Sequence, residues 1–262
     1  MAYSLICATA FFVSILTLFS GFGLGTVLMP VFAIFFPLPI AIAATGVVHL
    51  ANNIFKAVLV GKWAKWSIVF KFGLPAAFAS ALGAYLLGLV SNWPSITTYH
   101  LYTHAFHITP IGLIIGVIVI LSSFMELIPR FSKLSFPSHY IPVGGALSGF
   151  FGGISGYQGT LRSAFLIKAG LKKEEFIGTG VICSIIVDVI RIAIYGWALY
   201  SKKFAHMLSG EMRAILIAAC LSSFIGSYLG ARLVHRMTFK ALQIIVGIML
   251  LLLGAAIVLG IA

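Results

Sequence analysis

The chain has 262 residues, of which 61% are hydrophobic and only 8% are Asp, Glu, Lys or Arg. Soluble domains carry about 25% charged residues, so this chain cannot cover itself with a polar surface in water and must be an integral membrane protein. The formal net charge of +12 comes from Lys and Arg residues at the ends of apolar segments, where they are typical of cytoplasmic loop anchors rather than of a nucleic-acid surface.

Hydropathy divides the chain into eight apolar segments, which predicts an all-α polytopic membrane protein. The segments are Tyr3–Phe36, Ile40–Val60, Ile68–Val90, Ile108–Leu127, Tyr140–Ile167, Ile177–Tyr200, Ala214–Val234 and Ala241–Ile261. The longest polar connection is Ser91–His107. The connection that joins the two halves carries Arg130 and Lys133. We therefore expect a first transmembrane repeat at 1–128, a linker at 129–139 and a second repeat at 140–262.

The first segment of each half does not resemble a plain spanning helix. Tyr3–Phe36 is too long for one span and is interrupted by glycines at Gly21, Gly23 and Gly25, and its counterpart Tyr140–Ile167 also carries a dense run of glycines. Glycine in a helix costs about 1 kcal/mol relative to alanine. We predict a broken or re-entrant element in each half. The alternative is close helix packing through small residues, which we favour for Gly226 and Gly230.

The two halves repeat a pattern of small and polar residues. Gly25-Thr26 matches Gly159-Thr160, and Thr45-Gly46 matches Thr179-Gly180, in both cases 134 residues later. With a one-residue slip the further matches are Asn53 with Asp188 and Lys56 with Arg191, followed later by Gly83 with Gly226. A long hydrophobic chain that duplicates itself, with Gly-interrupted segments at matching places, is typical of secondary transporters.

Charge in the connections predicts that the repeats are inverted. The connection Ser91–His107 has no Lys or Arg, whereas its counterpart is bracketed by Arg232, Arg236 and Lys240. The connection Pro37–Pro39 is uncharged, whereas its counterpart carries Lys168, Lys172 and Lys173, and the basic stretch Gly61–Lys71 is also expected inside. Equivalent loops of opposite character lie on opposite faces if positive residues stay inside. One connection does not fit this rule: the inverted arrangement places Ser201–Arg213 outside, although it carries the basic residues Lys202, Lys203 and Arg213.

The helix breaks are candidate sites for an anion. An anion that enters a bilayer loses its hydration and needs hydrogen-bond donors in return, which the free N–H groups and partial positive charge at helix N-termini supply. We expect the substrate-binding residues to lie at the breaks and at the start of the following helices. They are Gly25, Thr26, Thr45, Gln158, Gly159, Thr160, Arg162 and Thr179. The threonine hydroxyls could instead bond to their own helices.

Arg162 is the strongest single candidate for a functional residue. Placing an arginine inside an apolar membrane segment costs several kcal/mol, so such a residue is functional by default. The alternative is that its side chain extends to the membrane interface beside Lys168. Asp188 and Arg191 form an i, i+3 pair in an apolar run, and their repeat counterparts are Asn53 and Lys56. We expect these four residues to serve either proton coupling or a neutralising ion pair.

Asp188 is expected to be the only acidic residue deep in a segment, because Glu126, Glu174, Glu175 and Glu211 all flank segment ends. One deep carboxylate does not provide the paired groups that an enzyme needs, so we predict that the protein is not an enzyme. His49 could titrate near neutral pH, but a buried, hydrogen-bonded role is favoured over a functional one.

We expect no metal and no cofactor. His100, His104 and His107 have a metal-like spacing but lie in a connection without acidic or cysteine partners. The three cysteines lie far apart inside apolar segments, without the spacing of a disulfide framework or a metal site.

The Gly-rich broken first segment running into Pro30, the Thr45-Gly46 helix start and the recurrence of both patterns in the second half resemble the sulfite exporter TauE/SafE family. The resemblance covers Gly21–Leu89 and Gly144–Leu259. It implies a permease for a small sulfur-containing anion such as sulfite, thiosulfate or an organosulfonate. The two halves differ at two matched positions: Pro30 of the first half is matched by Ala164 in the second, and Leu28 is matched by Arg162. These differences predict an asymmetric substrate site.

The sequence and the resemblance together predict a secondary transporter that works by alternating access in a prokaryotic inner (plasma) membrane. Its expected partners are the lipid bilayer and a small anion, with protons as a candidate coupling partner, and no nucleic acid. The alternatives are an anion channel and a non-transport membrane protein, either an enzyme or an assembly factor. The substrate, the direction of transport and the oligomeric state stay open at this point.

Overall fold

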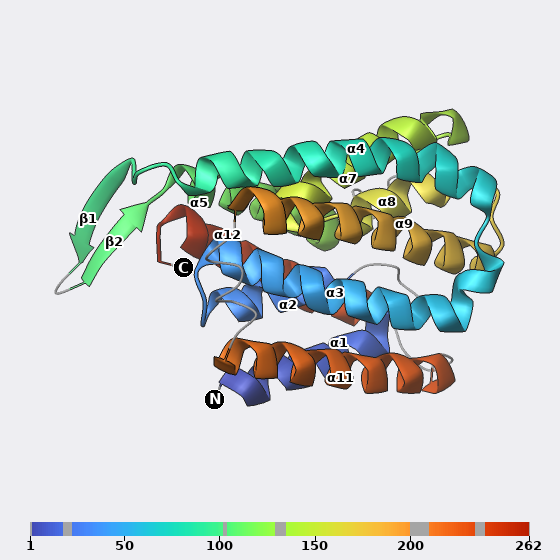
Figure 1. The fold of residues 1–262 in the computed structure, drawn as a ribbon, viewed down its shortest axis with the longest axis horizontal. Coiled ribbons are helices and arrows are strands. Elements are labelled where there is room, and N and C mark those ends of the chain that lie inside the picture. The colour runs from blue at the N-terminus through green and yellow to red at the C-terminus, as the bar shows by residue number, and fades with distance from the viewer. Residues whose placement is uncertain are drawn as a thin grey trace.

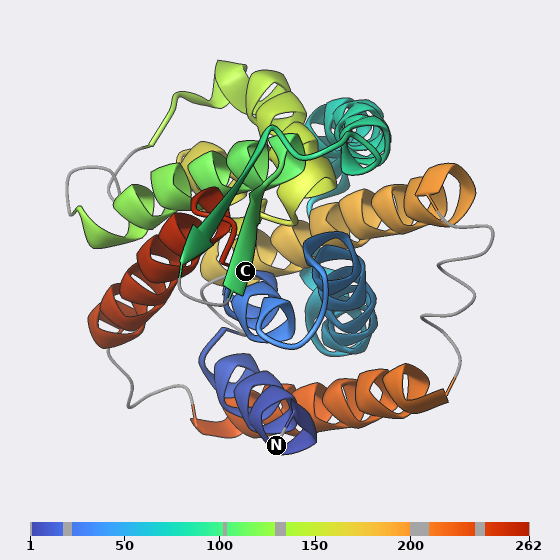
Figure 2. The same ribbon diagram turned by 90° about the vertical axis from the view of Figure 1, so that its left-hand side faces the viewer.

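A computed structural model of the protein describes residues 2–17, 23–101, 104–128, 135–199, 210–233 and 239–261. They form a bundle of helices with one small hairpin (Figures 1 and 2). The α-helices in chain order are α1 (Ala2–Thr17), α2 (Leu24–Ala33), α3 (Leu38–Val60), α4 (Trp66–Ser91), α5 (Pro110–Leu127), α7 (Ile141–Ser155), α8 (Gly159–Leu166), α9 (Lys173–Ile194), α11 (Gly210–Leu233) and α12 (Phe239–Val258). Single turns η1 (Gly61–Trp63), η2 (Ser138–Tyr140) and η3 (Tyr195–Leu199) extend or join them.

The outer faces of the bundle are apolar, as expected for a protein surrounded by lipid. Within the described ranges, five helices (α3, α4, α5, α9 and α11) are long and apolar enough to cross a membrane. Large apolar side chains such as Val58, Phe78 and Leu121 are exposed on their outer faces, whereas Asp188 and Arg191 are fully buried. Apolar groups outside and charged groups inside is the arrangement expected of an integral membrane protein.

A β-hairpin departs from the predicted all-α fold. Strand β1 (Thr97–Leu101) pairs antiparallel with β2 (His104–Ile108) inside the connection that was predicted as a polar loop. The β-branched and aromatic residues Thr97, Thr98, Tyr99 and Phe106 favour strands, but the stretch is too short and polar to register in a hydropathy profile. The Tyr99 hydroxyl donates to the Leu259 carbonyl at 2.7 Å, which ties the hairpin to the C-terminal end of α12.

Both halves contain a helix interrupted at glycine. In the second half, α7 ends at Gly156, whose φ of 80° favours glycine, and α8 begins at Gly159. In the first half, α2 begins directly after Gly23, whose φ is 120°, while Gly21 and Phe22 lie outside the described residues. None of α1, α2, α7 and α8 reaches the ~20 residues that a spanning helix needs. The predicted break of the second half is therefore present, whereas that of the first half lies partly outside the described residues.

Most glycines of α7 serve close packing rather than the break. A Cβ atom added at Gly145, Gly149 or Gly153 would lie 2.2–2.3 Å from a backbone oxygen of α4. Gly226 and Gly230 of α11 meet the α1 backbone in the same way, at 2.2 and 2.5 Å. The packing alternative is thus correct for Gly226 and Gly230 and also for these α7 glycines, and only the end of the α7 cluster forms the break. Small residues allow this approach because no side chain separates the backbones.

The centre of the bundle is formed by antiparallel neighbours. Helices α3 and α9 lie side by side, with Gly178 near the start of α9 against Val60 at the end of α3 and with His49 bonded to Asp188 farther along. Helices α5 and α12 are also antiparallel, since Gly112 near the start of α5 lies against Ile257. The two central helices α3 and α9 carry the buried side chains of Asn53, Lys56, Asp188 and Arg191.

The two basic connections come together at one end of the bundle. The Lys65 backbone N–H donates to the Thr179 hydroxyl at 2.9 Å, and the Lys65 ammonium lies 4.0 Å from Glu175. The α3–α4 and α8–α9 connections therefore share a face, and the hairpin lies at the opposite end (Figure 1). The other basic residues on which the orientation argument depends, Arg130, Lys133, Lys202, Lys203 and Arg236, lie outside the described residues.

Candidate functional site

Two helices each align three polar side chains on one face. On α3 these are His49, Asn53 and Lys56, and on α9 they are Ser184, Asp188 and Arg191. Both sets have the spacing i, i+4, i+7, which brings side chains onto one stripe of a helix. Because α3 and α9 pack against each other, the two stripes meet inside the bundle.

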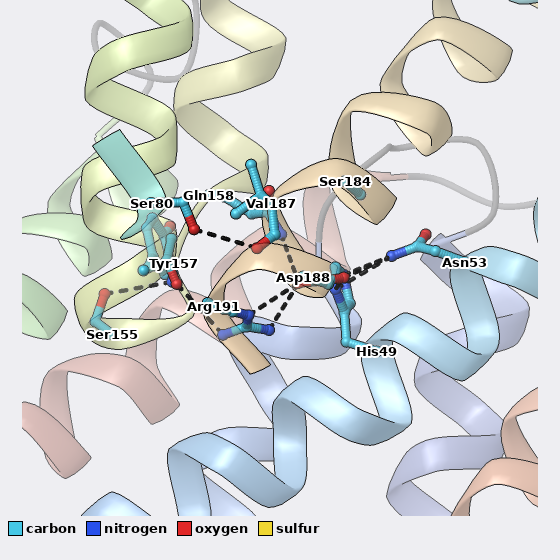
Figure 3. Close-up of polar contacts among 12 residues, drawn as sticks. His49, Asn53, Ser80, Ser155, Tyr157, Gln158, Ser184, Val187, Asp188 and Arg191 are labelled. Atoms are coloured by element: carbon cyan, nitrogen blue, oxygen red, sulfur yellow. Dashed lines mark hydrogen bonds and ion pairs between the residues drawn. The ribbon is translucent and has the colours of Figure 1, made fainter. Parts of the chain in front are cut away.

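The Asp188 carboxylate is the centre of a hydrogen-bond network (Figure 3). Its Oδ1 accepts from Arg191 Nε at 3.0 Å and from Gln158 Nε2 at 3.0 Å, and Arg191 Nη2 lies 2.9 Å from the same oxygen. Its Oδ2 lies 2.6 Å from His49 Nδ1 and accepts from Asn53 Nδ2 at 3.4 Å. An ionised carboxylate only accepts hydrogen bonds, so His49 donates from Nδ1. This network joins α3, α9 and the α7–α8 break.

Two repeated glycines make room for buried guanidinium groups. A Cβ atom at Gly46 would lie 3.3 Å from Arg191 Cζ, and one at Gly156 would lie 2.8 Å from Arg191 Nη1. Gly180, the repeat counterpart of Gly46, lies against Arg162 in a similar way, with 3.5 Å from the added Cβ to Nε. Each of these two repeated positions thus faces one buried arginine.

A small pocket lies next to the network and is lined by two cations. Its lining residues come from the end of α1, the start of α2, α3, α8 and α9, and they are Thr17, Leu24, His49, Asn53, Lys56, Arg162, Val181 and Ser184. Lys56 is 5% exposed and Arg162 3%. Arg162 donates from Nη1 to the Ser184 hydroxyl, whereas within the described part of the chain no hydrogen bond or ion pair involves the Lys56 ammonium. An anion in a low-dielectric interior needs opposite charge and hydrogen-bond donors nearby, and the side chains of Lys56 and Arg162 in the lining of one pocket supply both.

The two helix breaks meet beside this pocket. An added Cβ at Gly25 would lie 3.4 Å from the His49 ring and 3.7 Å from the Gly156 carbonyl oxygen. Leu24, the first residue of α2, lines the pocket. The first N–H groups of a helix have no partner within it and carry a partial positive charge. The start of α2 therefore adds to the positive character of the pocket.

The predicted site residues divide into two groups. Asn53, Lys56, Asp188, Arg191, Gln158 and Arg162 are brought together at the pocket and its network, with Gly25 beside them. The threonines take other places: Thr160 bonds to Glu126, Thr179 accepts from Lys65, and the buried Thr45 hydroxyl has no hydrogen-bond partner among the described residues. Thr26 is buried in the first turn of α2, and Gly159 begins α8.

Sequence reasoning favoured a hydrogen-bonded role for His49, whose ring bonds to Asp188, but it did not identify Ser184 or Glu126 as members of a buried cluster. His49 and Ser184 line the pocket, and the i, i+4, i+7 spacing with the predicted residues was the signal that could have found them. The expectation that Asp188 is the only deep acidic residue was wrong, because Glu126 is 4% exposed. A position near the end of a segment implied exposure, but the C-terminal turn of α5 is covered by α12 and by the start of α8.

A comparison with protein families decides the class of the protein. The model described as Sulfite exporter TauE/SafE matches residues 6–257. The chain belongs to the sulfite exporter TauE/SafE family. No curated protein and no solved structure matches the chain. Membership in the TauE/SafE family implies a membrane permease for sulfite or a related sulfur anion, and the cationic pocket agrees with an anionic substrate.

Proposed function

We propose that the protein carries a small sulfur oxyanion or sulfonate across the membrane by alternating access, with the pocket between α2, α3, α8 and α9 as its binding site. The observation that carries this proposal is the presence of Lys56 and Arg162 in the lining of one buried pocket. Transfer of an unpaired anion into a low-dielectric interior costs many kcal/mol. Two buried cations that already line the pocket offset that cost.

The lining side chains have distinct roles in this proposal. Arg162 offers a planar fork of N–H donors that matches two oxygens of a sulfonate or sulfite, and Lys56 adds a compact positive charge. Asn53 and Ser184 supply neutral hydrogen-bond groups, and the N-terminal turn of α2, including Gly25 and Thr26, supplies backbone N–H groups. Of the other predicted threonines, Thr160 and Thr179 hold helix ends in place through Glu126 and the Lys65 backbone rather than contacting the anion.

We further propose that the chain consists of two inverted repeats, 1–128 and 140–262, joined by 129–139. Helices α3 and α9 hold the matched motifs and run antiparallel in contact, and Asn53 bonds directly to its repeat counterpart Asp188. Glycine contacts support the same relation, since an added Cβ at Gly83 would meet the Phe150 oxygen at 2.3 Å and one at its counterpart Gly226 would meet the Phe11 oxygen at 2.2 Å. Inverted repeats permit one half to rock against the other around a central site.

Labelling of introduced cysteines tests the inversion. Pro37 and Lys168 lie in equivalent connections of the two halves, and both are exposed. In a cysteine-free background, Pro37→Cys should react with a membrane-impermeant reagent only from outside the cell and Lys168→Cys only from the cytoplasmic side, because basic connections remain inside. Reaction of both positions from the same side would show parallel repeats. The experiment, carried out in a prokaryotic inner membrane, also tests the proposed location.

Binding of sulfur anions to the purified protein tests the proposed function. Sulfite, thiosulfate, sulfoacetate and taurine are added at constant ionic strength, and the thermal midpoint is recorded. A ligand that binds the folded state alone stabilises it by about 2.7 kcal/mol at 100 times its Kd. At least one sulfur anion should raise the midpoint with saturation, whereas chloride should not. The absence of a saturable shift with every anion would contradict the assignment of the pocket.

A further inference from the structure

A second buried polar cluster lies on the far side of the α7–α8 break from Asp188. Its acidic member is Glu126, in the last turn of α5, with 4% of its surface exposed. Glu126 Oε1 accepts from the Thr160 hydroxyl at 2.6 Å and from the Tyr157 hydroxyl at 3.1 Å. The Tyr157 hydroxyl also lies 3.1 Å from Thr160 Oγ1 and 3.3 Å from the Ser122 carbonyl oxygen. Glu126 is therefore held to the break and to the start of α8 by hydroxyl groups.

Glu126 differs from Asp188 in its charge environment. Asp188 is paired with Arg191 and accepts from Gln158 and Asn53 as well. Within the described ranges no cationic side chain forms an ion pair with Glu126, and its Oε2 atom is buried without a hydrogen-bond partner. An unpaired buried carboxylate is costly when ionised and readily takes up a proton. Asp188, by contrast, is held as an anion by its partners.

The groups around Glu126 are hydroxyls, a backbone carbonyl and a glycine, so Glu126 is the acidic group of this cluster that can bind a proton. Tyr157 is the titratable side chain that contacts it from the break, Thr160 contacts it from α8, and Ser122 lies on its own helix. From α12, an added Cβ at Gly247 would lie 3.3 Å from Glu126 Cβ, so a glycine without a side chain faces it there. The hydroxyl and carboxylate oxygens are hydrogen-bonded to one another at 2.6–3.1 Å, and among the described residues no group of three or more His, Cys, Asp or Glu side chains lies together.

The cluster is connected to the pocket by only a few residues. Thr160, which bonds to Glu126, stands two positions before Arg162, which lines the pocket. Tyr157, which also bonds to Glu126, is followed by Gln158, which bonds to Asp188. A change in the bonds of Glu126 therefore acts on the start of α8 and on both sides of the break.

We propose that Glu126 is a proton-binding site that couples anion transport to proton movement through the α7–α8 break. This inference rests on the proposed anion carrier and adds its coupling ion. When Glu126 is ionised, it accepts bonds from Thr160 and Tyr157 and holds the start of α8 in the position seen here. When a proton binds at the free Oε2, the carboxyl group becomes neutral, and the bonds that Oε1 accepts from Thr160 and Tyr157 lose the strength that the negative charge gave them. The start of α8 is then released together with Arg162, and the proton and the anion move in one cycle.

Transport in proteoliposomes tests the coupling with a matched control. Glu126→Gln removes the proton site and keeps the side-chain shape, and Glu211→Gln makes the same change at an exposed glutamate of α11. Exchange of labelled sulfite at equal pH on both sides measures the carrier alone, and net accumulation of sulfite under a pH gradient measures coupling. Protein-free liposomes give the passive leak. Wild type and Glu211→Gln should accumulate sulfite, whereas Glu126→Gln should exchange sulfite but accumulate at least tenfold less.

A second variant supports the assignment without removing the acid. Tyr157→Phe deletes one donor to the Glu126 carboxylate, so the pH of half-maximal accumulation should move upward while exchange is retained. Accumulation by Glu126→Gln at the wild-type level would overturn the proposal, as would accumulation driven by a sodium gradient at equal pH. An unchanged pH profile in Tyr157→Phe would also count against it. Absence of sulfite exchange by the wild type would instead contradict the proposed function itself.

Discussion

Replacement of Arg162 by alanine should abolish binding of the sulfur anion while the protein still folds. Arg162 is buried, lines the pocket and donates to the Ser184 hydroxyl, which lines the same pocket. Hydrogen bonds to a charged group contribute about 1.5–3 kcal/mol each, so loss of a forked pair should weaken binding about 100-fold or more. Arg162→Lys keeps the charge without the fork and should retain part of the affinity.

The control for this prediction is Lys168→Ala, which removes an exposed cation shortly after the same helix. Binding is measured by the shift of the thermal midpoint with anion concentration, and folding by the midpoint without anion. Lys168→Ala should bind as the wild type does. If Arg162→Ala also bound normally, Arg162 would not contact the substrate, and the pocket would lose half of the charge on which its assignment depends.

Disruption of the Asp188–Arg191 pair should destabilise the protein strongly, and removal of both charges should restore much of the loss. Both side chains are fully buried, and the carboxylate also holds Gln158 and His49. Removal of one member of a buried pair costs about 3–5 kcal/mol, because the other charge is left uncompensated. We expect Asp188→Asn and Arg191→Gln each to lower the thermal midpoint sharply and the double variant to be more stable than Arg191→Gln alone.

The same three variants, Asp188→Asn, Arg191→Gln and the double variant, distinguish a structural role for Asp188 from a role in proton coupling. If Asp188 is structural, the double variant should keep sulfite accumulation under a pH gradient, because Glu126 is unchanged. The double variant is the informative protein here, since either single variant is expected to be unstable. Additive destabilisation in the double variant would show that the two residues do not stabilise each other. Loss of pH-driven accumulation with exchange intact would assign coupling to Asp188 instead of Glu126.

The parts of the structure that are local in sequence could be predicted. The break after Gly156, the Asp188–Arg191 pair and the burial of Arg162 depend on residues within one or two turns of each other. The match between the two halves singled out Asn53 and Asp188 as repeat counterparts, and these two side chains are in contact in the structure. These features follow from helix periodicity and from the cost of glycine and charge in an apolar segment.

The remaining features depend on how the helices pack, which no local pattern contains. Ser184 and His49 line the pocket only because α3 and α9 are antiparallel neighbours. Thr179 matched Thr45 in sequence but caps the Lys65 backbone, because the α3–α4 connection folds over the start of α9. Glu126 resembles an interface residue in the sequence, but the start of α8 packs against it in the fold. The hairpin was missed because strand signals are weak in a short polar stretch.

Counterflow of labelled sulfite in proteoliposomes tests the carrier proposal most directly. Vesicles loaded with unlabelled sulfite are diluted into a trace of labelled sulfite, with wild type and Arg162→Ala measured side by side. A carrier with one buried anion site should show transient accumulation of label in the wild type, with saturation and competition by thiosulfate or a sulfonate, and none in Arg162→Ala. Label entry that rises linearly with concentration, without overshoot and to the same extent in both proteins, would indicate a channel and contradict the proposed site.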